Sequence, residues 1–296
     1  MQKLAAIIVT HNRKELLLQL VDGLLSQSLL PQQIFIVDNQ STDGTELVLG
    51  QAFLPSDRIT YTRLAGNVGG AGGFNAGIKL AYERGYDWFW LMDDDALPTP
   101  DALENLAKQA NDPLTIYGST ALYEGRLCWP IIYQGKMVSL IDDLPESVSV
   151  SGIPFLGFFI HRNMVDMIGF PDVEFFISGD DIEYCQRAKN LGYAVVMVKN
   201  SHIHHPMPQR FTINLWNRPF FLLVQAPWRR YYDIRNRIVI ARRHYSLQLY
   251  TATLPGIIFR WILTLCFEEN RWLQSIAYFR GIKDGLMNRL GKTWGI

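Results

Sequence analysis

The stretch from Trp88 to Asp95, WFWLMDDD, decides the fold, because an apolar run ends abruptly in three carboxylates. The run predicts a buried strand whose acids lie where it reaches the surface. Asp93 and Asp95 are two residues apart, so along an extended chain their side chains point to one side. Two carboxylates facing one point repel unless a cation lies between them, and Mg²⁺ or Mn²⁺, often with phosphate oxygens, is the usual solution. A solvated acidic turn or a helix cap is the alternative.

Strand patterns alternate with helix patterns through the first third of the chain. Further strands are predicted at residues 4–10, 34–37 and 59–64, and helices at 15–29, 45–51 and 74–84. This alternation predicts an α/β fold with a mainly parallel sheet flanked by helices. Ligands bind such sheets beyond the carboxyl ends of the strands, so we expect Thr10, Asp38 and Asp93 to share one crevice.

A glycine-dense loop is predicted at residues 66–73, before the third helix. It is not a GxGxxG fingerprint, because Asn75 stands where the third glycine should be. It is not a Walker loop, because Ile78 stands in place of the lysine. What remains is a backbone that a ligand can approach closely, at a helix start that favours anions. A flexible connection is the alternative.

A second acidic pair, Asp180-Asp181, follows an apolar run and opens a helix. Acids in a first turn cap the helix and favour its dipole, and we expect Asp180 to act partly in this way. The functional interpretation is that the other acid acts as a general base. An aspartate with an ordinary pKa of about 3.9 is ionised and available for this at neutral pH.

Composition sets the compartment and the partners. Of the 296 residues, 48% are apolar, and the three cysteines lie far apart without a zinc pattern, which favours a reducing cytoplasm. The chain opens without a signal-peptide pattern, and no uncharged apolar run reaches the roughly 18 residues of a membrane span.

Charge is distributed unevenly along the chain. Residues 1–228 carry 16 Lys and Arg against 24 Asp and Glu, whereas residues 229–296 carry 12 against 4. The basic end is rich in large apolar residues, notably at 257–263 and 272–279, which suits an anionic membrane surface better than nucleic acid. A helical bundle packed on the main domain, or a contact in a homo-oligomer, is the alternative.

Further elements are predicted along the middle of the chain. They are helices at 101–110 and 162–168, strands within 117–133 and at 152–160 and 192–198, a mobile polar loop at 137–151, and a loop or lid at 206–227.

Four motifs in fixed order carry a family resemblance. They are residues 10–13 (THNR), 37–45 (VDNQSTDGT), 67–75 (NVGGAGGFN) and 90–95 (WLMDDD). Together they resemble family-two glycosyltransferases of the GT-A fold, and among these the bacterial galactofuranosyl- and rhamnosyltransferases. The likeness covers residues 4–236, which implies a GT-A domain at 1–236 and a helical, basic, amphipathic appendage at 237–296.

The resemblance implies roles for the motif residues. Thr10 and Asp38 would contact the base and ribose of a nucleotide sugar, and Asp93 and Asp95 would hold its diphosphate through Mn²⁺ or Mg²⁺. Asp181 would be the catalytic base, with Asp180 beside it. The remaining candidates for donor binding in these motifs are Asn12, Arg13, Asn67, Gly70, Gly72 and Asp94.

Two later stretches gain roles in the same way. Three histidines lie at 202–205, where neither HExxH nor a cysteine partner supports zinc. By resemblance His205 would complete the metal site, with His204 as the fallback, while a polar strand end is the alternative. The string 228–236 recurs in the family, so Trp228, Arg229 and Tyr232 would contact the donor, and Arg229 and Tyr232 would offset charge on the leaving diphosphate. A helix start with basic surface residues is the alternative.

The expected function is therefore a metal-dependent, inverting hexosyltransferase. UDP-galactofuranose is the first choice of donor and dTDP-rhamnose the second. The expected acceptor is a glycan, lipid-linked at the cytoplasmic face of a bacterial membrane, in cell-surface polysaccharide or O-antigen synthesis. Two other classes stay open. A nucleotidyltransferase would need a basic residue near its glycine loop, where only Lys79 is available, and a non-catalytic nucleotide-sugar binding module would not need Asp181.

Overall fold

The computed structural model describes residues 2–53, 56–215 and 218–294. The chain forms two compact units. Unit 1 contains Met1–Asp172 and Tyr184–Met207, and unit 2 contains Val173–Glu183 and Pro208–Ile296. The chain therefore enters unit 2 twice. This division differs from the predicted boundary after residue 236, since residues 173–183 and 208–236 also belong to unit 2. A boundary after residue 236 would cut the continuous helix α7 (Pro227–His244).

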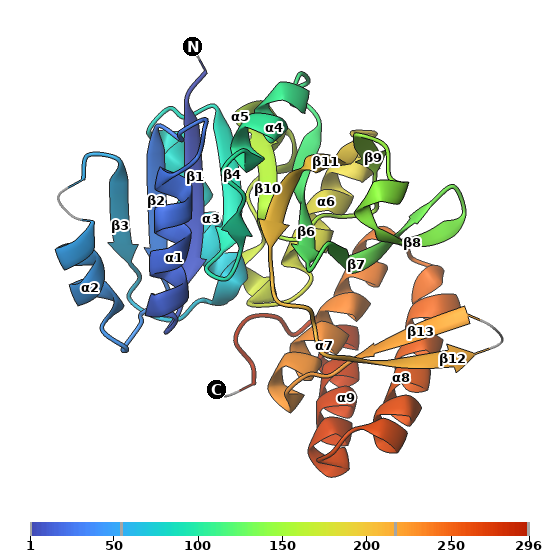
Figure 1. The fold of residues 1–296 in the computed structure, drawn as a ribbon. Coiled ribbons are helices and arrows are strands. Elements are labelled where there is room, and N and C mark those ends of the chain that lie inside the picture. The colour runs from blue at the N-terminus through green and yellow to red at the C-terminus, as the bar shows by residue number, and fades with distance from the viewer. Residues whose placement is uncertain (1, 54–55, 216–217, 295–296) are drawn as a thin grey trace. The chain divides into compact units, whose positions relative to one another are not determined.

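Unit 1 is built on one large sheet (Figure 1). Its main path runs β3-β2-β1-β4-β10-β6-β11-β5, with β7, β8 and β9 attached at the side. The neighbours of β1 pair with it in parallel, and β10 runs antiparallel between β4 and β6. The strands are β1 (Leu4–Thr10), β2 (Gln33–Asp38), β3 (Ile59–Arg63), β4 (Trp88–Asp93), β5 (Leu97–Pro98), β6 (Ile116–Tyr123), β7 (Arg126–Tyr133), β8 (Lys136–Leu140), β9 (Ser147–Ser149), β10 (Leu156–His161) and β11 (Val195–His204).

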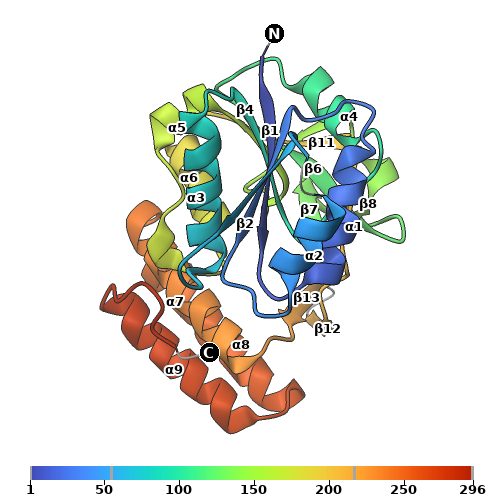
Figure 2. The same ribbon diagram turned by 90° about the vertical axis from the view of Figure 1, so that its left-hand side faces the viewer.

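Helices cover both faces of this sheet (Figure 2). One face carries α1 (Lys14–Leu25), α2 (Thr45–Ala52) and α4 (Ala102–Gln109), and the other carries α3 (Gly69–Glu83), α5 (Arg162–Ile168) and the later part of α6 (Asp180–Asn190). The predicted α/β sheet flanked by helices is confirmed.

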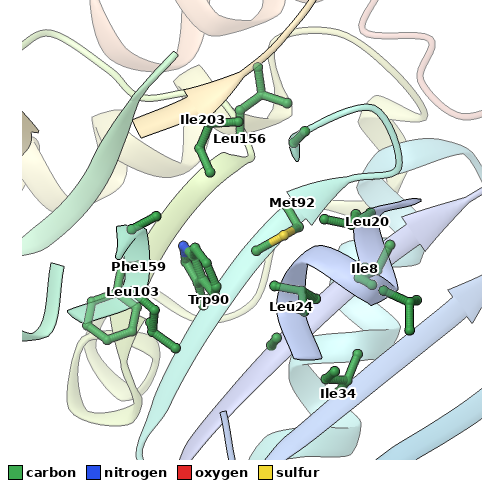
Figure 3. Packing of buried hydrophobic residues seen from close by; sticks show 14 of the residues in the cluster. Ile8, Leu20, Leu24, Ile34, Trp90, Met92, Leu103, Leu156, Phe159 and Ile203 are labelled. Atoms are coloured by element: carbon green, nitrogen blue, oxygen red, sulfur yellow. The ribbon is translucent and has the colours of Figure 1, made fainter. Parts of the chain in front are cut away.

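Strand β4 contributes to both cores. Trp90 and Met92 pack on the α1 side (Figure 3), whereas Phe89 and Leu91 pack on the α3 side. A strand buried on both faces needs apolar residues at every position, which explains the continuous WFWLM run.

Several boundaries differ from those predicted. Helix α3 begins at Gly69 and not at 74, so most of the predicted glycine loop is helical. The predicted polar loop 137–151 contains β8, the short 3₁₀ helix η1 (Ile141–Asp143) and β9. In each of these two strands only the middle residue, Val138 or Val148, is buried in a small side core. A short edge strand with one buried apolar residue looks like a loop in the sequence.

Unit 2 contains three long helices and a hairpin. They are α7, α8 (Leu254–Phe267), α9 (Arg271–Leu286), β12 (Arg210–Leu215) and β13 (Arg218–Leu223). The predicted helices of the C-terminal region are thus present, with residues 295–296 outside the described part. The predicted lid 206–227 contains the hairpin, and its residues 216–217 also lie outside that part.

The close packing of α9 on α7 depends on two glycines. A Cβ atom at Gly281 would lie 2.9 Å from the carbonyl oxygen of Tyr231, and one at Gly285 would lie 2.9 Å from that of Arg235. The two backbones therefore approach directly, and Ile234, Ile238 and Tyr278 are buried beside them.

Within the described residues, one helical stretch has the length and composition to cross a membrane. It is Leu249–Phe267, which has 19 residues and a mean hydropathy of 1.4, and 22% of this apolar stretch is buried. It includes a π-helical turn at Leu249–Thr253 before α8, and Arg260 interrupts its apolar run.

Candidate active site

The carboxyl ends of three adjacent strands lie side by side in unit 1. In the sheet register Thr10 at the end of β1 pairs with Asp38 at the end of β2, and Val9 pairs with Asp93 at the end of β4. The expected convergence of these ends is confirmed, because β1 lies between the two strands that carry the acids.

Asp94 points into the protein. Thr10 Oγ1 donates a hydrogen bond to Asp94 Oδ2 at 2.8 Å, and Arg13 donates to Asp94 Oδ1 at 3.1 Å and to Asp95 Oδ2 at 2.7 Å. Asp94 is 6% exposed, and burial raises the pKa of its carboxyl while the Arg13 charge opposes this. The predicted donor contacts Thr10 and Asp94 are therefore bonded to each other, and they fix the end of β4 against β1.

Strand β4 ends at Asp93, so the prediction from side-chain alternation, which assumed an extended chain as far as Asp95, does not apply. The N–H of Ala96 donates to the carbonyl oxygen of Asp93 at 3.2 Å, which closes a turn through Asp94 and Asp95. Because the backbone is not extended there, the spacing of two residues no longer determines whether Asp93 and Asp95 face one side. Among the described residues, no group of three or more metal-ligating side chains is gathered at one point.

Asp95 and His205 form the pair best suited to a divalent metal. Asp95 Oδ1 lies 3.6 Å from His205 Nε2. Burial lowers the pKa of His205 and so favours the neutral imidazole that a metal requires, although the Asp95 charge opposes this. A carboxylate oxygen and an imidazole nitrogen at this separation fit two positions around one ion, with the others open to phosphate oxygens and water. The fallback His204 is exposed.

A cavity of about 340 Å³ opens beside this pair. Its polar wall contains Asp94, Asp95, His204 and His205. Its apolar wall is contributed by Leu16, Leu20, Leu97 and Leu122.

Asp38 organises the turn after β2. It is fully buried, and its Oδ1 accepts hydrogen bonds from the N–H of Ser41 at 2.8 Å and from the Ser41 hydroxyl at 2.6 Å. Its Oδ2 accepts one from the Tyr61 hydroxyl at 2.6 Å. Asn12, with φ of 55°, joins this turn to the end of β1, because its N–H donates to Ser41 Oγ and its Oδ1 accepts from the N–H of Thr42.

The glycine segment is tied to the end of β2 by Asn39, a residue that the sequence analysis did not select. Asn39 donates to the carbonyl oxygen of Gly69 at 3.1 Å and accepts from the N–H of Val68 at 3.2 Å. Asn67 accepts from the N–H of Gly69. The sequence signal that could have identified Asn39 is its position as a polar residue directly after Asp38.

The two predicted glycines lie in the first turn of α3 and differ in their surroundings. A Cβ atom at Gly72 would lie 2.5 Å from Val68 Cγ2, so this glycine is needed for packing. Gly70 has open space around its Cβ position and leaves the backbone accessible to a ligand.

The second acidic pair opens α6 and belongs to unit 2. Phe176, Ser178 and Gly179 have φ values of 63°, 70° and 80°, so the chain turns sharply before Asp180. Asp180 is 7% exposed, and both burial and the charge of Asp181 raise its pKa. Burial raises the pKa of Asp181 to about 6, and Asp181 Oδ1 accepts from the N–H of Ile182 at 2.7 Å.

The string 228–236 forms the first half of α7. Tyr232 is fully buried, and its hydroxyl is hydrogen bonded to both the N–H and the carbonyl oxygen of Trp294. Trp228 is half-buried, and exposed Arg229 lies over its ring at 5.1 Å. In unit 2, Tyr232 therefore supports packing, and of the three predicted donor contacts Arg229 is the one open to solvent.

Carboxylates at adjacent carboxyl ends of sheet strands, beside a glycine-rich helix start, are typical of the ligand-binding edge of an α/β protein. Residues 5–130 match the family model of glycosyl transferase family 2. The galactofuranosyltransferase GlfT1 of Mycolicibacterium smegmatis is 32% identical over 247 residues, covering 78% of this chain and 80% of that protein. The chain belongs to the family-2 glycosyltransferases and is an enzyme of the hexosyltransferase class.

A second relative spans nearly the whole chain. The dTDP-rhamnosyl transferase RfbF of Shigella flexneri is 24% identical over 301 residues, covering 97% of this chain and 96% of that protein. Solved structures share the GT-A fold. The mannosyltransferase PcManGT from Pyrobaculum calidifontis in complex with GDP-Man and Mn²⁺ aligns with a TM-score of 0.60 at 15% identity, covering 98% of this chain and 88% of that one.

Staphylococcus aureus TarS 1–349 in complex with UDP-GlcNAc aligns with a TM-score of 0.61 at 14% identity. It covers 97% of this chain and 81% of that one. At this level of identity the two structures establish the fold, and the predicted GT-A architecture is confirmed.

The Thr10–Asp94 hydrogen bond yields a testable prediction. Thr10→Val keeps the shape of the side chain but leaves a buried carboxylate without one donor, so we expect stability to fall by about 1–3 kcal/mol. Thr10→Ser keeps the hydroxyl and is the matched control. Thermal unfolding without a nucleotide measures both variants. Equal melting temperatures for the two would show that the bond does not stabilise the site.

Proposed function

We propose that the enzyme transfers a hexose from a nucleotide sugar to a glycan acceptor with inversion and with a divalent metal. The observation that carries this proposal is the pair of Asp95, after β4, and His205, after β11, in a chain whose relatives are hexosyltransferases. Asp95 and His205 would hold Mn²⁺ or Mg²⁺. When bound, the metal neutralises the diphosphate that leaves the sugar.

The chemistry breaks the bond between the anomeric carbon and the phosphate oxygen while the acceptor oxygen attacks that carbon from the opposite face. The nucleoside diphosphate leaves with the bonding electron pair. The acceptor hydroxyl loses its proton, and the carboxylate of Asp181 receives it. The raised pKa of Asp181 makes this carboxylate a better proton acceptor than an exposed aspartate.

UDP-galactofuranose is the proposed donor. Support comes from the GlfT1 relatives, which include the protein of Mycobacterium tuberculosis strain H37Rv at 28% identity over 256 residues. dTDP-rhamnose is the alternative donor, because the match to RfbF spans nearly the full chain. In either case the acceptor would be a lipid-linked glycan in bacterial cell-surface polysaccharide synthesis, O-antigen included.

We also propose that the enzyme works at the cytoplasmic face of the membrane, attached through unit 2. Trp272 is 77% exposed and Leu247 72% exposed, although both are large and apolar. The segment 229–296 has a formal charge of +8, from 12 basic and 4 acidic residues. Exposed apolar side chains on a basic helical region suit an anionic lipid surface.

Substitution of Asp181 tests the base. We expect Asp181→Asn to reduce kcat by at least about 100-fold, since general base catalysis contributes factors of this size. Donor binding, followed as thermal stabilisation by the sugar nucleotide, should survive. Exposed Asp143→Asn is the matched control. In the unaltered enzyme kcat should rise with pH through about 6, because Asp181 must be ionised and burial raises its pKa to about 6. Unchanged turnover in Asp181→Asn would remove this residue from the mechanism and favour another class of nucleotide-binding protein.

Metal-dependent stabilisation tests the metal pair and the donor together. A ligand that binds only the folded state raises the melting temperature. We expect UDP-galactofuranose with Mn²⁺ to raise it more than dTDP-rhamnose with Mn²⁺, and EDTA to abolish most of the effect. His205→Ala and Asp95→Asn should lose the metal dependence, whereas the control His204→Ala should retain it. The reverse result for the two histidines would move the metal to His204.

Vesicle sedimentation tests the membrane surface. Truncation after α7 is unsuitable, because α9 covers buried residues of α7. We instead expect the double substitution Trp272→Ser and Leu247→Ser to weaken binding to anionic vesicles at least about tenfold, from the lost apolar burial. Ile132→Ser, at a position in β7 that is 75% exposed, is the matched control. If the double variant and the Ile132→Ser control bound vesicles equally well, and the unaltered chain had the mass of a dimer that only the double variant lost, the surface would be assigned to a homo-oligomer.

A further inference from the structure

The turn just before Asp180 and Asp181 accepts hydrogen bonds from buried polar side chains of α7. The two N–H groups of Asn236 are shared among three carbonyl oxygens of the turn, those of Phe175 at 3.1 Å, Ile177 at 2.9 Å and Ser178 at 2.7 Å from the amide nitrogen. Asn236 is fully buried. One side chain thus satisfies the carbonyl groups of the turn just before the two acids.

Arg235 supports the same turn from the neighbouring position. It is also fully buried, and its guanidinium donates to the carbonyl oxygen of Phe175 at 2.8 Å and that of Glu174 at 3.3 Å. Its Nε donates to Asn236 Oδ1 at 2.8 Å, which fixes the orientation of the amide. The two side chains therefore act as one hydrogen-bonded group.

The remaining donors of Arg235 reach the C-terminal segment, residues 291–294. Arg235 donates to the carbonyl oxygen of Gly291 at 2.6 Å and to Thr293 Oγ1 at 3.1 Å. The N–H of Gly291 returns to the carbonyl oxygen of Glu174 at 2.7 Å. The C-terminal segment and the acidic turn, more than a hundred residues apart in the sequence, are thus bonded to one guanidinium and to each other.

The backbone of the turn needs such support. Phe176 and Ser178 are not glycines, yet both have φ values near +65°, at 63° and 70°. Non-glycine residues in this region persist only where their surroundings determine the conformation. The Phe176 ring packs on Tyr232 at 5.0 Å between centroids, and Gly179 lies against α7, where an added Cβ would come 3.2 Å from Ile240 Cδ1.

We propose that Asn236, Arg235 and the segment 291–294 form a positioning device that sets the conformation of the Asp180–Asp181 turn for catalysis. The inference rests on the proposed function, in which Asp181 receives the acceptor proton. Asn236 and Arg235 are positioning residues, because they reach the acids through the backbone of 174–179. A displaced base costs turnover without affecting donor affinity, and a misplacement of about 1 Å costs on the order of 100-fold.

Three variants test the device. Asn236→Asp keeps the size of the side chain but replaces the donating N–H groups with a carboxylate that faces carbonyl oxygens. A chain ended after Leu290 keeps α7 and α9 whole and removes the acceptors of Arg235 at 291 and 293, together with the bond from Gly291 to Glu174 and those between Trp294 and Tyr232. Arg237→Ala is the matched control, because it removes a surface ion pair with Asp233 from the same helix.

Two measurements are made on each variant and on the unaltered enzyme. Amide hydrogen exchange of peptides covering 174–183 reports the order of the turn, independently of activity. Steady-state kinetics separate kcat from the donor KM. We expect the first two variants to speed exchange in 174–183 and to lower kcat at least about tenfold, with the donor KM unchanged within about twofold. Arg237→Ala should match the unaltered enzyme in both.

The possible failures are distinct. Unchanged exchange in both test variants, or faster exchange with unchanged kcat, would overturn the positioning role. A fall in kcat that Arg237→Ala reproduces would overturn it as well. If Asn236→Asp does not fold, the shortened chain alone decides. Wild-type turnover in Asp181→Asn would refute the proposed base, which is a different result from unchanged exchange at 174–183.

Discussion

The end of β4 brings three consecutive carboxylates to one turn, and the rest of the site depends on how their charge is compensated. Arg13 contacts two of them, Asp94 and Asp95, and Thr10 donates to Asp94. Both compensating residues come from β1 and the residues directly after it, and β1 is the neighbour of β4 in the sheet. An isolated buried carboxylate is costly, whereas a paired and hydrogen-bonded one is tolerated. The parallel pairing of β1 with β4 therefore stabilises the turn at Asp94 and Asp95 as well as the core.

The sheet was predictable because its central strands are buried on both faces. Such strands read as continuous apolar runs, and the polar residues at their ends mark the ligand-binding edge. The edge strands β8 and β9 were not predictable, since each buries a single valine. The start of α3 was missed because four of its first five residues are glycines, which suggest a loop. Their role in packing appears only where Val68 and other side chains approach them.

Part of the site could not be predicted from the sequence either. Alternation placed Asp93 and Asp95 on one side, but the chain leaves the extended conformation at Asp93, so the rule no longer applies. Asn39 and Asn236 stood within the quoted motifs without a role. Each lies among other polar or charged residues that mark no role for it, and its partners are backbone groups about 30 and 60 residues away along the chain. No local pattern identifies a bond to a distant carbonyl.

These two buried asparagines show how each unit fixes the loop beside its acids. An amide carries both a donor and an acceptor without a net charge, so it can satisfy buried backbone groups at a smaller desolvation cost than an ion. Asn39 does this beside Asp38, and Asn236 does it before Asp180 and Asp181. The charge around the acids differs, however. Arg13 pairs with the acids of unit 1, whereas within the described residues Asp180 and Asp181 are in no ion pair, and burial raises the pKa of both. Carboxylates beside a cation suit the binding of charged groups, and carboxylates with a raised pKa and no paired cation suit proton transfer, so the two environments separate the two proposed roles.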